Sequence, residues 1–356
     1  MHRSMTRSVN FLMLVLFFTG AVLSPVAAKP FAVHYALKGI VDLQKGVPYL
    51  HTADGRVFQL LMKADAAKSL DGKAVGVNGK VGKSDDVEQV KVKKIAILPD
   101  QNIEIPVVEH ESYQRPAKIL QNLAGTVTVE NIRWDIRQNE KSEKKTAIHT
   151  WETATIDPDK VKSAYLLVKP FAPKFIAAHT LMAFSFADGG VVAKTGKKSN
   201  NLVLSIEAYK KVGQSYGLVK TMKKEFDIVW ILTNLKNYAE LNVNYNESSD
   251  TEIMVYRLKL DKQQIKALLA ETIKQTCVNR QGEYYHTIRN NCTNNLVILL
   301  NSVLSEENQV KLWRIPGIIY NHKATMPFSV LKALKKIGLI GEPMRTISKT
   351  NFVTDL

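Results

Sequence analysis

The chain has 356 residues, enough for two domains, and its 45% hydrophobic content is ordinary for a globular protein with a buried core. Its formal net charge is +16, from 49 lysines and arginines against 33 acidic residues. The first 28 residues are expected to be an export signal, as argued next, and outside the cytoplasm this charge favours anionic lipid head groups, acidic glycans or acidic peptides over a nucleic-acid partner. A solvated basic surface without a special partner is the alternative.

Residues 1–28 have the three parts of a cleaved export signal. Arg3 and Arg7 precede an apolar run from Phe11 to Leu23, and Val26-Ala27-Ala28 supplies the small residues of a cleavage site. The run is shorter than the about 20 residues of a membrane span, although an uncleaved anchor is the alternative. No later segment is apolar enough to cross a bilayer, so we expect an exported protein that is soluble or peripheral to the membrane.

Residues 29–98 are expected to form a small all-β barrel of the OB-like type. Short alternating segments are separated by turn signals, which is typical of such barrels. Gly39, Gly76 and Gly79 stand where the strands would bend. The five expected strands are Leu37–Leu43, Pro48–His51, Arg56–Met62, Ala74–Val81 and Gln89–Leu98. The segment holds no catalytic cluster, so we expect a binding or accessory module.

Residues 99–149 are expected to be a linker and an entry segment, with Pro99 and Pro106 as chain breakers. The residues around Lys141–Lys145 form a charge cluster that is expected to be a solvated loop. A strand-rich stretch follows. The expected strands are Ala164–Val168, His179–Phe186, Leu202–Glu207, Phe226–Thr233 and Met254–Leu260, with a hairpin-type turn at Asp188-Gly189-Gly190.

Helical spacing begins after Leu260, with Asp261 as the expected N-cap. A second helix is expected to start near Cys292, and a third, basic amphipathic helix near Pro327. The third helix could lie on a membrane surface or pack against the protein.

Cys292 carries the strongest chemical signal. It lies just before the apolar run of its helix, between Arg289-Asn290-Asn291 and Thr293-Asn294-Asn295. A cysteine at a helix N-terminus is stabilised as thiolate, the nucleophile of covalent acyl transfer. A structural cysteine is the alternative. Cys277 continues the apolar stripe of the preceding helix and is expected to be a buried inert thiol, with a Cys277–Cys292 disulfide as the rival interpretation.

A thiol nucleophile needs a base, and two histidines are candidates. His179 begins a strand that should be buried on both faces, and His286 lies six residues before Cys292. The spacing does not rank one above the other. Glu207 is an acid inside an apolar strand, and it could orient the base or form a structural ion pair.

Motifs for other chemistries are not found in the sequence. There is no phosphate-binding glycine loop, CxxC, HExxH or metal-spaced cluster. We therefore expect no cofactor and no metal.

Several pieces together resemble the N-terminal periplasmic domain of Lnb, a bacterial lipoprotein N-acyltransferase. In chain order they are Ala178-His179-Thr180 with Phe184 and Phe186, Leu204-Ser205-Ile206-Glu207-Ala208, Ser215-Tyr216, Tyr256-Arg257-Leu258, Tyr284-Tyr285-His286-Thr287, Asn290-Asn291-Cys292-Thr293, Ile315-Pro316-Gly317 and Gly338-Leu339-Ile340. The similarity covers roughly residues 150–345, and its most specific piece is the Asn-Cys-Thr element.

The resemblance implies an α+β protein with a permuted papain-like fold of the NlpC type, in which the histidine strand precedes the cysteine helix. It implies Cys292 as nucleophile, His179 as general base and Glu207 as third member. Substrate contacts are expected from Asn291, Thr293, Ser205 and Tyr216. By the family's chemistry, Cys292 would take an acyl chain from a lipid ester as a thioester and pass it to an amine.

These inferences give a domain plan and two hypotheses. The plan is a signal peptide at 1–28, an OB-like barrel at 29–98, a linker at 99–149, a papain-like periplasmic domain at 150–345 and a tail at 346–356.

In the first hypothesis, the protein is a periplasmic thiol acyltransferase or hydrolase that meets phospholipid or lipoprotein at a membrane surface. In the second, it is a non-catalytic binding or scaffold protein that uses the barrel and the basic surface. The oligomeric state is not predicted.

Overall fold

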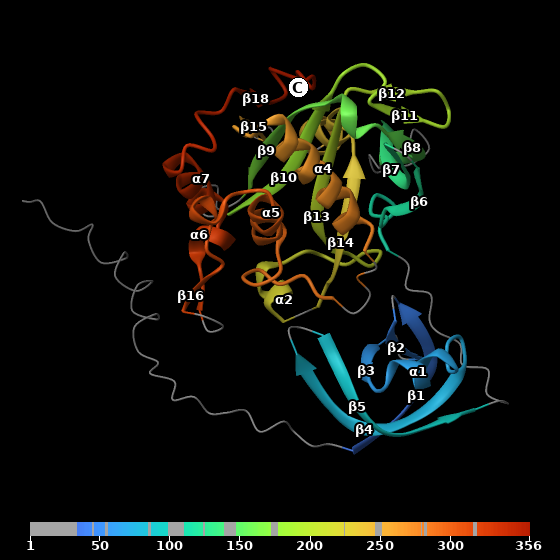
Figure 1. The fold of residues 1–356 in the computed structure, drawn as a ribbon. Helices are drawn as coiled ribbons and strands as arrows, with labels where there is room; N and C mark the ends of the chain where they lie inside the picture. The colour runs from blue at the N-terminus through green and yellow to red at the C-terminus, as the bar shows by residue number, and fades with distance from the viewer. Residues whose placement is uncertain are drawn as a thin grey trace, which may run out of the picture.

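The computed structural model describes residues 34–44, 46–53, 56–84, 87–98, 110–123, 125–138, 147–171, 177–223, 225–245, 251–278, 280, 283–315 and 319–356. Several segments discussed above lie outside the described residues. They are the expected signal peptide, residues 99–109 of the expected linker, the charge cluster at 141–145 and Pro316-Gly317. The protein is α+β, with a closed barrel and a large mixed sheet (Figure 1).

The N-terminal part is a closed five-stranded barrel, as predicted. Its strands are β1 (His34–Gln44), β2 (Val47–Thr52), β3 (Val57–Leu61), β4 (Ala74–Ser84) and β5 (Val87–Ile97), in the order β1-β2-β3-β5-β4, with α1 (Ala64–Lys68) between β3 and β4. Alternate residues such as Leu50, Phe58 and Val75 point into the barrel and are buried. A Cβ at Gly39 would lie 2.2 Å from the His51 carbonyl oxygen, and one at Gly79 2.4 Å from that of Lys91. The barrel therefore closes only with glycine at these two bends.

The rest of the chain forms an eleven-stranded sheet. Its order is β12-β11-β8-β7-β14-β13-β10-β9-β15-β18, with β6 paired to β7. Among the described residues, the strand pairs of this sheet are antiparallel except β7 with β14. The strands are β6 (Lys118–Leu123), β7 (Thr126–Gln138), β8 (Ala147–Ile156), β9 (Val161–Phe171), β10 (Ala177–Phe186), β11 (Val191–Ala193), β12 (Lys198–Ser199), β13 (Asn201–Tyr209), β14 (Asp227–Thr233), β15 (Ile253–Arg257) and β18 (Arg345–Ile347).

The long hairpin of β7 and β8 is a structural feature that the sequence pattern did not predict. The register between these strands shifts between Val129 and Ile132 and again between Arg133 and Ile136. Asn131 has a positive φ of 64° inside the first irregularity. Bulges of this kind insert extra residues and break the period of two by which a strand is read from sequence.

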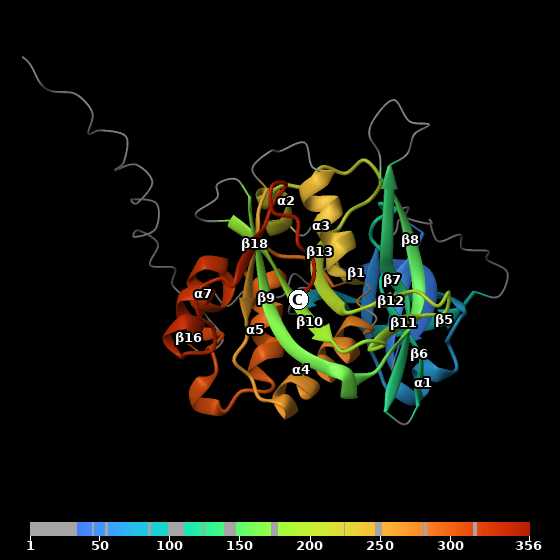
Figure 2. The same cartoon turned by 90° about the horizontal axis from the view of Figure 1, so that it is seen from above.

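Helices cover both faces of the sheet (Figure 2). The helices are α2 (Leu218–Met222), α3 (Leu235–Ala239), α4 (Lys262–Thr276), α5 (Cys292–Asn301), α6 (His322–Thr325) and α7 (Pro327–Lys336); α3 runs into a π-helical turn (Glu240–Asn244), 3-10 turns lie at Pro158–Lys160 and Glu306–Asn308, and β16 (Trp313–Ile315) pairs with β17 (Ile319–Tyr320). Helices α4, α5 and α7 share one hydrophobic core with the sheet, and α3 belongs to a second core on the other face.

The three helices expected at the C-terminal end are confirmed. Asp261 caps α4 in a reciprocal capping box with Gln264. Val330 and Leu334 of α7 are buried in the same core as α4 and α5, so the basic third helix packs against the protein. Among the described residues, the helices are too short or too polar to span a bilayer.

Candidate functional site

Cys292 is the first residue of α5, and its neighbours fix the start of that helix. The Asn291 side chain accepts a hydrogen bond from the Asn294 backbone N–H at 2.9 Å, and the Asn294 side chain accepts one from the Asn291 backbone N–H at 2.7 Å. This reciprocal cap leaves the thiol at the positive end of the helix dipole. The helix start predicted from the sequence is confirmed.

The Cys292 thiol is 4% exposed and polar groups surround it. The Tyr285 hydroxyl donates to the sulfur at 3.8 Å, and the Thr293 hydroxyl lies 3.8 Å from it. Burial raises the pKa of the thiol, but the charge of His179 and hydrogen-bonding interactions with His179 and Thr180 outweigh burial and lower the pKa to about 6. At neutral pH the sulfur is therefore mainly thiolate.

His179 lies near the start of β10, and its ring is held from the neighbouring strand β13. Its Nε2 lies 2.8 Å from the Ser205 hydroxyl oxygen, and this hydroxyl donates to Glu207 Oε1 at 2.7 Å. An ionised carboxylate can only accept hydrogen bonds, so the Ser205 hydroxyl donates its single proton to Glu207. Ser205 then accepts from His179 Nε2–H, and Nδ1 is the nitrogen left to accept a proton.

Glu207 is therefore linked to His179 through Ser205 rather than directly. Burial raises the pKa of its carboxyl, but the charges of Arg133 and His179 and hydrogen bonds from Ser205 and Gln114 outweigh burial, so the pKa lies below its usual range. Gln114 Nε2 donates to Glu207 Oε2 at 2.8 Å. Glu207 is thus a carboxylate that both orients Ser205 and balances a buried cation.

Arg133 is that cation, and sequence reasoning missed it together with Gln114. Arg133 is fully buried at 0% exposure in β7. Its Nε donates to Asn237 Oδ1 at 2.8 Å, and its Nη1 donates to the Tyr113 carbonyl at 2.8 Å. An arginine between the apolar Ile132 and Trp134 was the available signal, but the bulges in β7 conceal which face of the strand it occupies.

His286, the other candidate base, is used by its own turn. Its Nδ1 accepts hydrogen bonds from the backbone N–H groups of Ile288 at 3.1 Å and Arg289 at 3.3 Å. His179 is prominent among the groups that lower the pKa of Cys292. Of the two histidines, His179 is the one that the fold brings to the thiol.

No disulfide joins Cys277 and Cys292, so that alternative is not realised. Cys277 is the C-cap of α4 and is half-buried against the core.

The four expected substrate contacts have different environments. Asn291 caps α5, the Thr293 hydroxyl lies 3.1 Å from that of Thr180, and Ser205 bridges His179 and Glu207. These three side chains are used in contacts within the protein. Tyr216 is 44% exposed, and burial of its hydroxyl and the nearby Cys292 sulfur raise its pKa to about 12. Tyr216 is the one of the four that stands open at the site.

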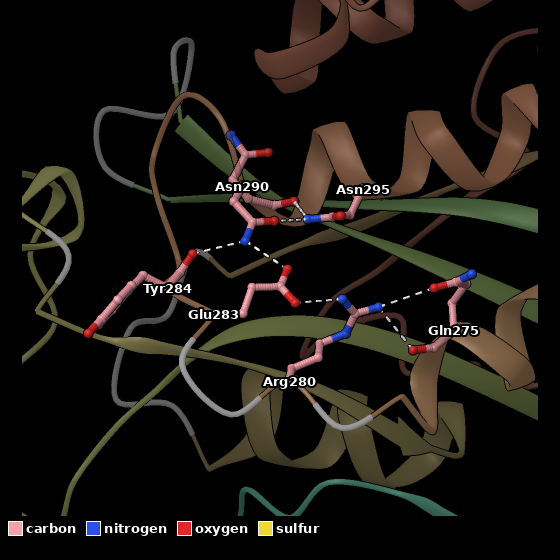
Figure 3. Close-up of polar contacts among 7 residues, drawn as sticks. Gln275, Arg280, Glu283, Tyr284, Asn290 and Asn295 are labelled. Carbon is pink, nitrogen blue, oxygen red and sulfur yellow. Dashed lines mark hydrogen bonds and ion pairs between the residues drawn. The ribbon is translucent and has the colours of Figure 1, made fainter. Parts of the chain in front are cut away.

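A polar network anchors the segment that leads into Cys292 (Figure 3). Asn290 Nδ2 donates to Glu283 Oε1 and to the Tyr284 carbonyl, each at 2.9 Å, and its Oδ1 accepts from Asn295 Nδ2 at 2.8 Å. Arg280 Nη1 donates to Glu283 Oε2 at 2.8 Å. The Arg280 guanidinium also stacks over the Trp230 ring, 4.0 Å from its centroid. These contacts tie the loop to α4, β14 and α5.

The described parts of the chain contain no cluster of three or more histidine, cysteine, aspartate or glutamate side chains arranged to hold a metal ion.

Comparison with known proteins gives one match. The family model described as the Lnb N-terminal periplasmic domain matches residues 147–336, which is more than half of the chain. No curated protein and no solved structure matches the chain. The matched range contains His179, Glu207 and Cys292, and the periplasmic family agrees with the export expected from the sequence. The chain belongs to the Lnb N-terminal periplasmic domain family.

Proposed function

We propose that the protein is an exported, thiol-dependent acyltransferase or hydrolase in which Cys292 attacks an acyl ester or amide and His179 acts as the base. One observation carries this proposal. The Cys292 thiol has its pKa lowered to about 6 despite burial, and the main cause of the lowering is His179. A structural buried cysteine has a raised pKa and is inert, so this environment favours a nucleophile.

The arrangement of elements supports a permuted papain-like interpretation of the fold. The histidine strand β10 precedes the cysteine helix α5 in the chain, and α5 shares the hydrophobic core of that strand's sheet. The same pairing of a helix-start cysteine with a strand histidine recurs in thiol enzymes of unrelated sequence, where geometry and roles define the site.

The proposed reaction has two steps. The Cys292 thiolate attacks the acyl carbonyl carbon, a C–S bond forms, and the bond to the leaving oxygen or nitrogen breaks as His179 gives it a proton. The first backbone N–H groups of α5 have no intrahelical partner, and we propose that they donate to the carbonyl oxygen as it gains charge. An amine or water, deprotonated by His179, then attacks the thioester carbon and releases the thiolate.

Phospholipid or lipoprotein is the proposed source of the acyl group. An exported protein is separated from cytoplasmic ATP and coenzyme A thioesters, so an activated acyl donor must already be present as an ester in the membrane. The family match to a periplasmic domain supports this location.

Intact-protein mass spectrometry after incubation with phospholipid vesicles tests the proposal. The wild type should gain a mass equal to an acyl chain, and Cys292→Ala should not. Cys277→Ala is the matched control, because it removes the other cysteine of the chain and should leave the adduct unchanged. An undiminished adduct on Cys292→Ala would refute Cys292 as the nucleophile.

One observation favours the second hypothesis, a binding or scaffold protein without catalysis. The sulfur is 4% exposed and is covered in part by Tyr285. A small alkylating reagent at pH 7 separates the two hypotheses, because an accessible thiolate reacts quickly and a sealed thiol does not. Slow alkylation of Cys292 compared with Cys277 would favour the binding function.

A further inference from the structure

Large apolar side chains are exposed in a group at the end of the molecule that holds Cys292. We call this group the apolar rim. Its members come from α2, from the loop before α5, from the β16–β17 hairpin and from the residue before α7. They are Met222 (45% exposed), Ile288 (45%), Trp313 (38%), Ile315 (48%), Ile319 (48%) and Met326 (38%).

Two side-chain contacts attach parts of the rim to the Cys292 loop. The hydroxyls of Thr221 and Thr287 form a hydrogen bond, which places Met222 beside this loop. The Thr325 hydroxyl donates to the Ile288 carbonyl at 2.9 Å, which attaches the segment just before Met326 to the backbone of Ile288.

The β16–β17 hairpin is attached to α5 itself. Asn294 Nδ2 donates to the Tyr320 hydroxyl at 3.2 Å, and the Trp313 and Tyr320 rings pack edge to face with centroids 4.6 Å apart. Asn294 is two residues after Cys292, so the exposed Ile315 and Ile319 project from a hairpin anchored at the start of the nucleophile helix. An isolated two-stranded hairpin is marginally stable in water, and this one exposes its apolar residues instead of burying them.

Five of the six rim residues, all except Met222, lie in a strongly cationic part of the chain. From Tyr284 to Gly341 the sequence has 7 lysines and arginines and only 2 acidic residues, Glu306 and Glu307. Four of the cations are exposed within three residues of a rim residue in sequence: Arg289, Lys311, Arg314 and Lys323. Apolar residues that include a tryptophan, flanked by lysine and arginine, form the combination that binds the interface of an anionic bilayer.

We propose that the apolar rim inserts into the surface of an anionic phospholipid membrane, with Arg289, Lys311, Arg314 and Lys323 on the head groups. The inference rests on the proposed function and deepens it, because insertion of the rim would hold Cys292 at the depth of the acyl ester groups. Scattered apolar residues are normal on a protein surface, but a contiguous set marks a contact site. Here hydrogen bonds attach the segments that carry the rim to the loop before Cys292 and to α5.

Tryptophan fluorescence with lipid vesicles gives a direct test. Trp134 and Trp230 are buried and Trp151 is half-buried, so Trp313 is the exposed tryptophan among the four. Addition of phosphatidylglycerol vesicles should shift the emission to the blue, and phosphatidylcholine vesicles should produce a smaller shift. No shift with phosphatidylglycerol would overturn the proposal.

Vesicle sedimentation tests the hairpin. The double variant Ile315→Ser with Ile319→Ser should bind phosphatidylglycerol vesicles about tenfold or more weakly, since each partly exposed isoleucine loses its transfer from water to the bilayer. Leu120→Ser is the matched control, because Leu120 is 52% exposed on β6. Equal thermal unfolding of both variants checks that they fold. Equal vesicle binding by the double variant and by Leu120→Ser would contradict membrane insertion. Binding of the hairpin to a soluble acidic protein in the absence of vesicles, weakened by the same double substitution, would contradict it as well.

The failure of this proposal can be told apart from the failure of the proposed function. Cys292→Ala should give no acyl adduct but should sediment with vesicles like the wild type. A wild-type protein that binds vesicles and gains no adduct would refute acyl transfer alone. A wild-type protein that gains an adduct from detergent-dispersed lipid but does not bind vesicles would refute only the proposed membrane insertion of the apolar rim.

Discussion

The two faces of the sheet at β10 and β13 hold the two halves of the site by different physical means. On the α5 face, Met182, Leu204 and Ile206 pack with the cysteine helix in an apolar core. On the α3 face, Ser205, Arg133 and Asn237 are buried and polar beside the apolar residues of the second core. The nucleophile is therefore positioned by packing, and the base is positioned by hydrogen bonds and charge. Substitutions on the two faces should consequently separate fold stability from thiol reactivity.

The largest effect is expected from Glu207→Gln, which leaves Arg133 charged and buried without its carboxylate. The two charges act on each other across the core, so we expect a cost of about 3 kcal/mol of unfolding free energy, the lower end of the range for removing one partner of a buried ion pair. Urea denaturation at pH 7 measures it, with Glu225→Gln as an exposed control. Because the folded pKa of Glu207 is lowered, its stabilisation is present above the unfolded pKa of 4.5 and is lost as pH falls through the lower folded pKa. The difference between variant and wild type should therefore shrink in acid, and a constant difference would contradict the charge argument.

His179→Ala should change reactivity more than stability. The wild-type alkylation rate should rise with pH through a midpoint near 6, where the Cys292 thiol titrates. Without the histidine charge, burial remains, and the midpoint should move above about 8.5, the value of a free cysteine. At pH 7 the rate should fall at least about 30-fold, since the thiolate fraction falls by that amount. The exposed His322→Ala is the control, and an unchanged midpoint in His179→Ala would show that another group lowers the thiol pKa.

Ser205→Ala tests the bridge between the two residues. It leaves His179 Nε2 and Glu207 Oε1 without their shared partner, which should cost about 1–3 kcal/mol of stability. Acyl-adduct formation should slow by about 10-fold or more, because the orienting contact of the ring is lost. Ser163→Ala is the matched control, because Ser163 is a buried serine on β9 with 5% exposure. It should change neither the rate of acyl-adduct formation nor the dependence of that rate on pH. Similar rates for the two variants would argue that the bridge is only structural.

The smallest effect is expected from the helix cap. Asn291→Ala should cost about 1 kcal/mol, as N-cap replacements usually do. It should also raise the alkylation midpoint by roughly half a pH unit, because a frayed first turn weakens the favourable dipole at the thiolate. Asp261→Ala removes the equivalent cap of α4 and should cost similar stability without moving the midpoint. A shift in both variants would indicate a global effect on the fold.

The sequence predicted those parts of the fold in which the hydrophobic period is regular. The barrel strands and the starts of α4 and α5 follow directly from alternation and capping residues. The β7–β8 hairpin was missed because its bulges interrupt the period of two. The parts of the fold that could be predicted from the sequence are therefore mostly those with a regular local hydrophobic pattern.

The site was predictable for the residues with distinctive chemistry. Cys292 stands out at a helix start, and family resemblance singled out His179. The partners of Glu207 were not predictable, because Gln114 is 93 residues away in the chain and Arg133 reaches Asn237 across 104 residues. Such contacts depend on strand order and register, which no local pattern contains.

Gln114 and Arg133 also bear on where the working unit begins. The family match starts at residue 147, and both side chains precede it. A fragment trimmed to the matched residues would retain the nucleophile and the histidine. It would lack the amide and the guanidinium that keep Glu207 ionised, together with β7, the neighbour of β14 in the sheet. A fragment that retains the reactive site must therefore start before Tyr113. A shorter fragment would contain the reactive residues without the surroundings that make them reactive.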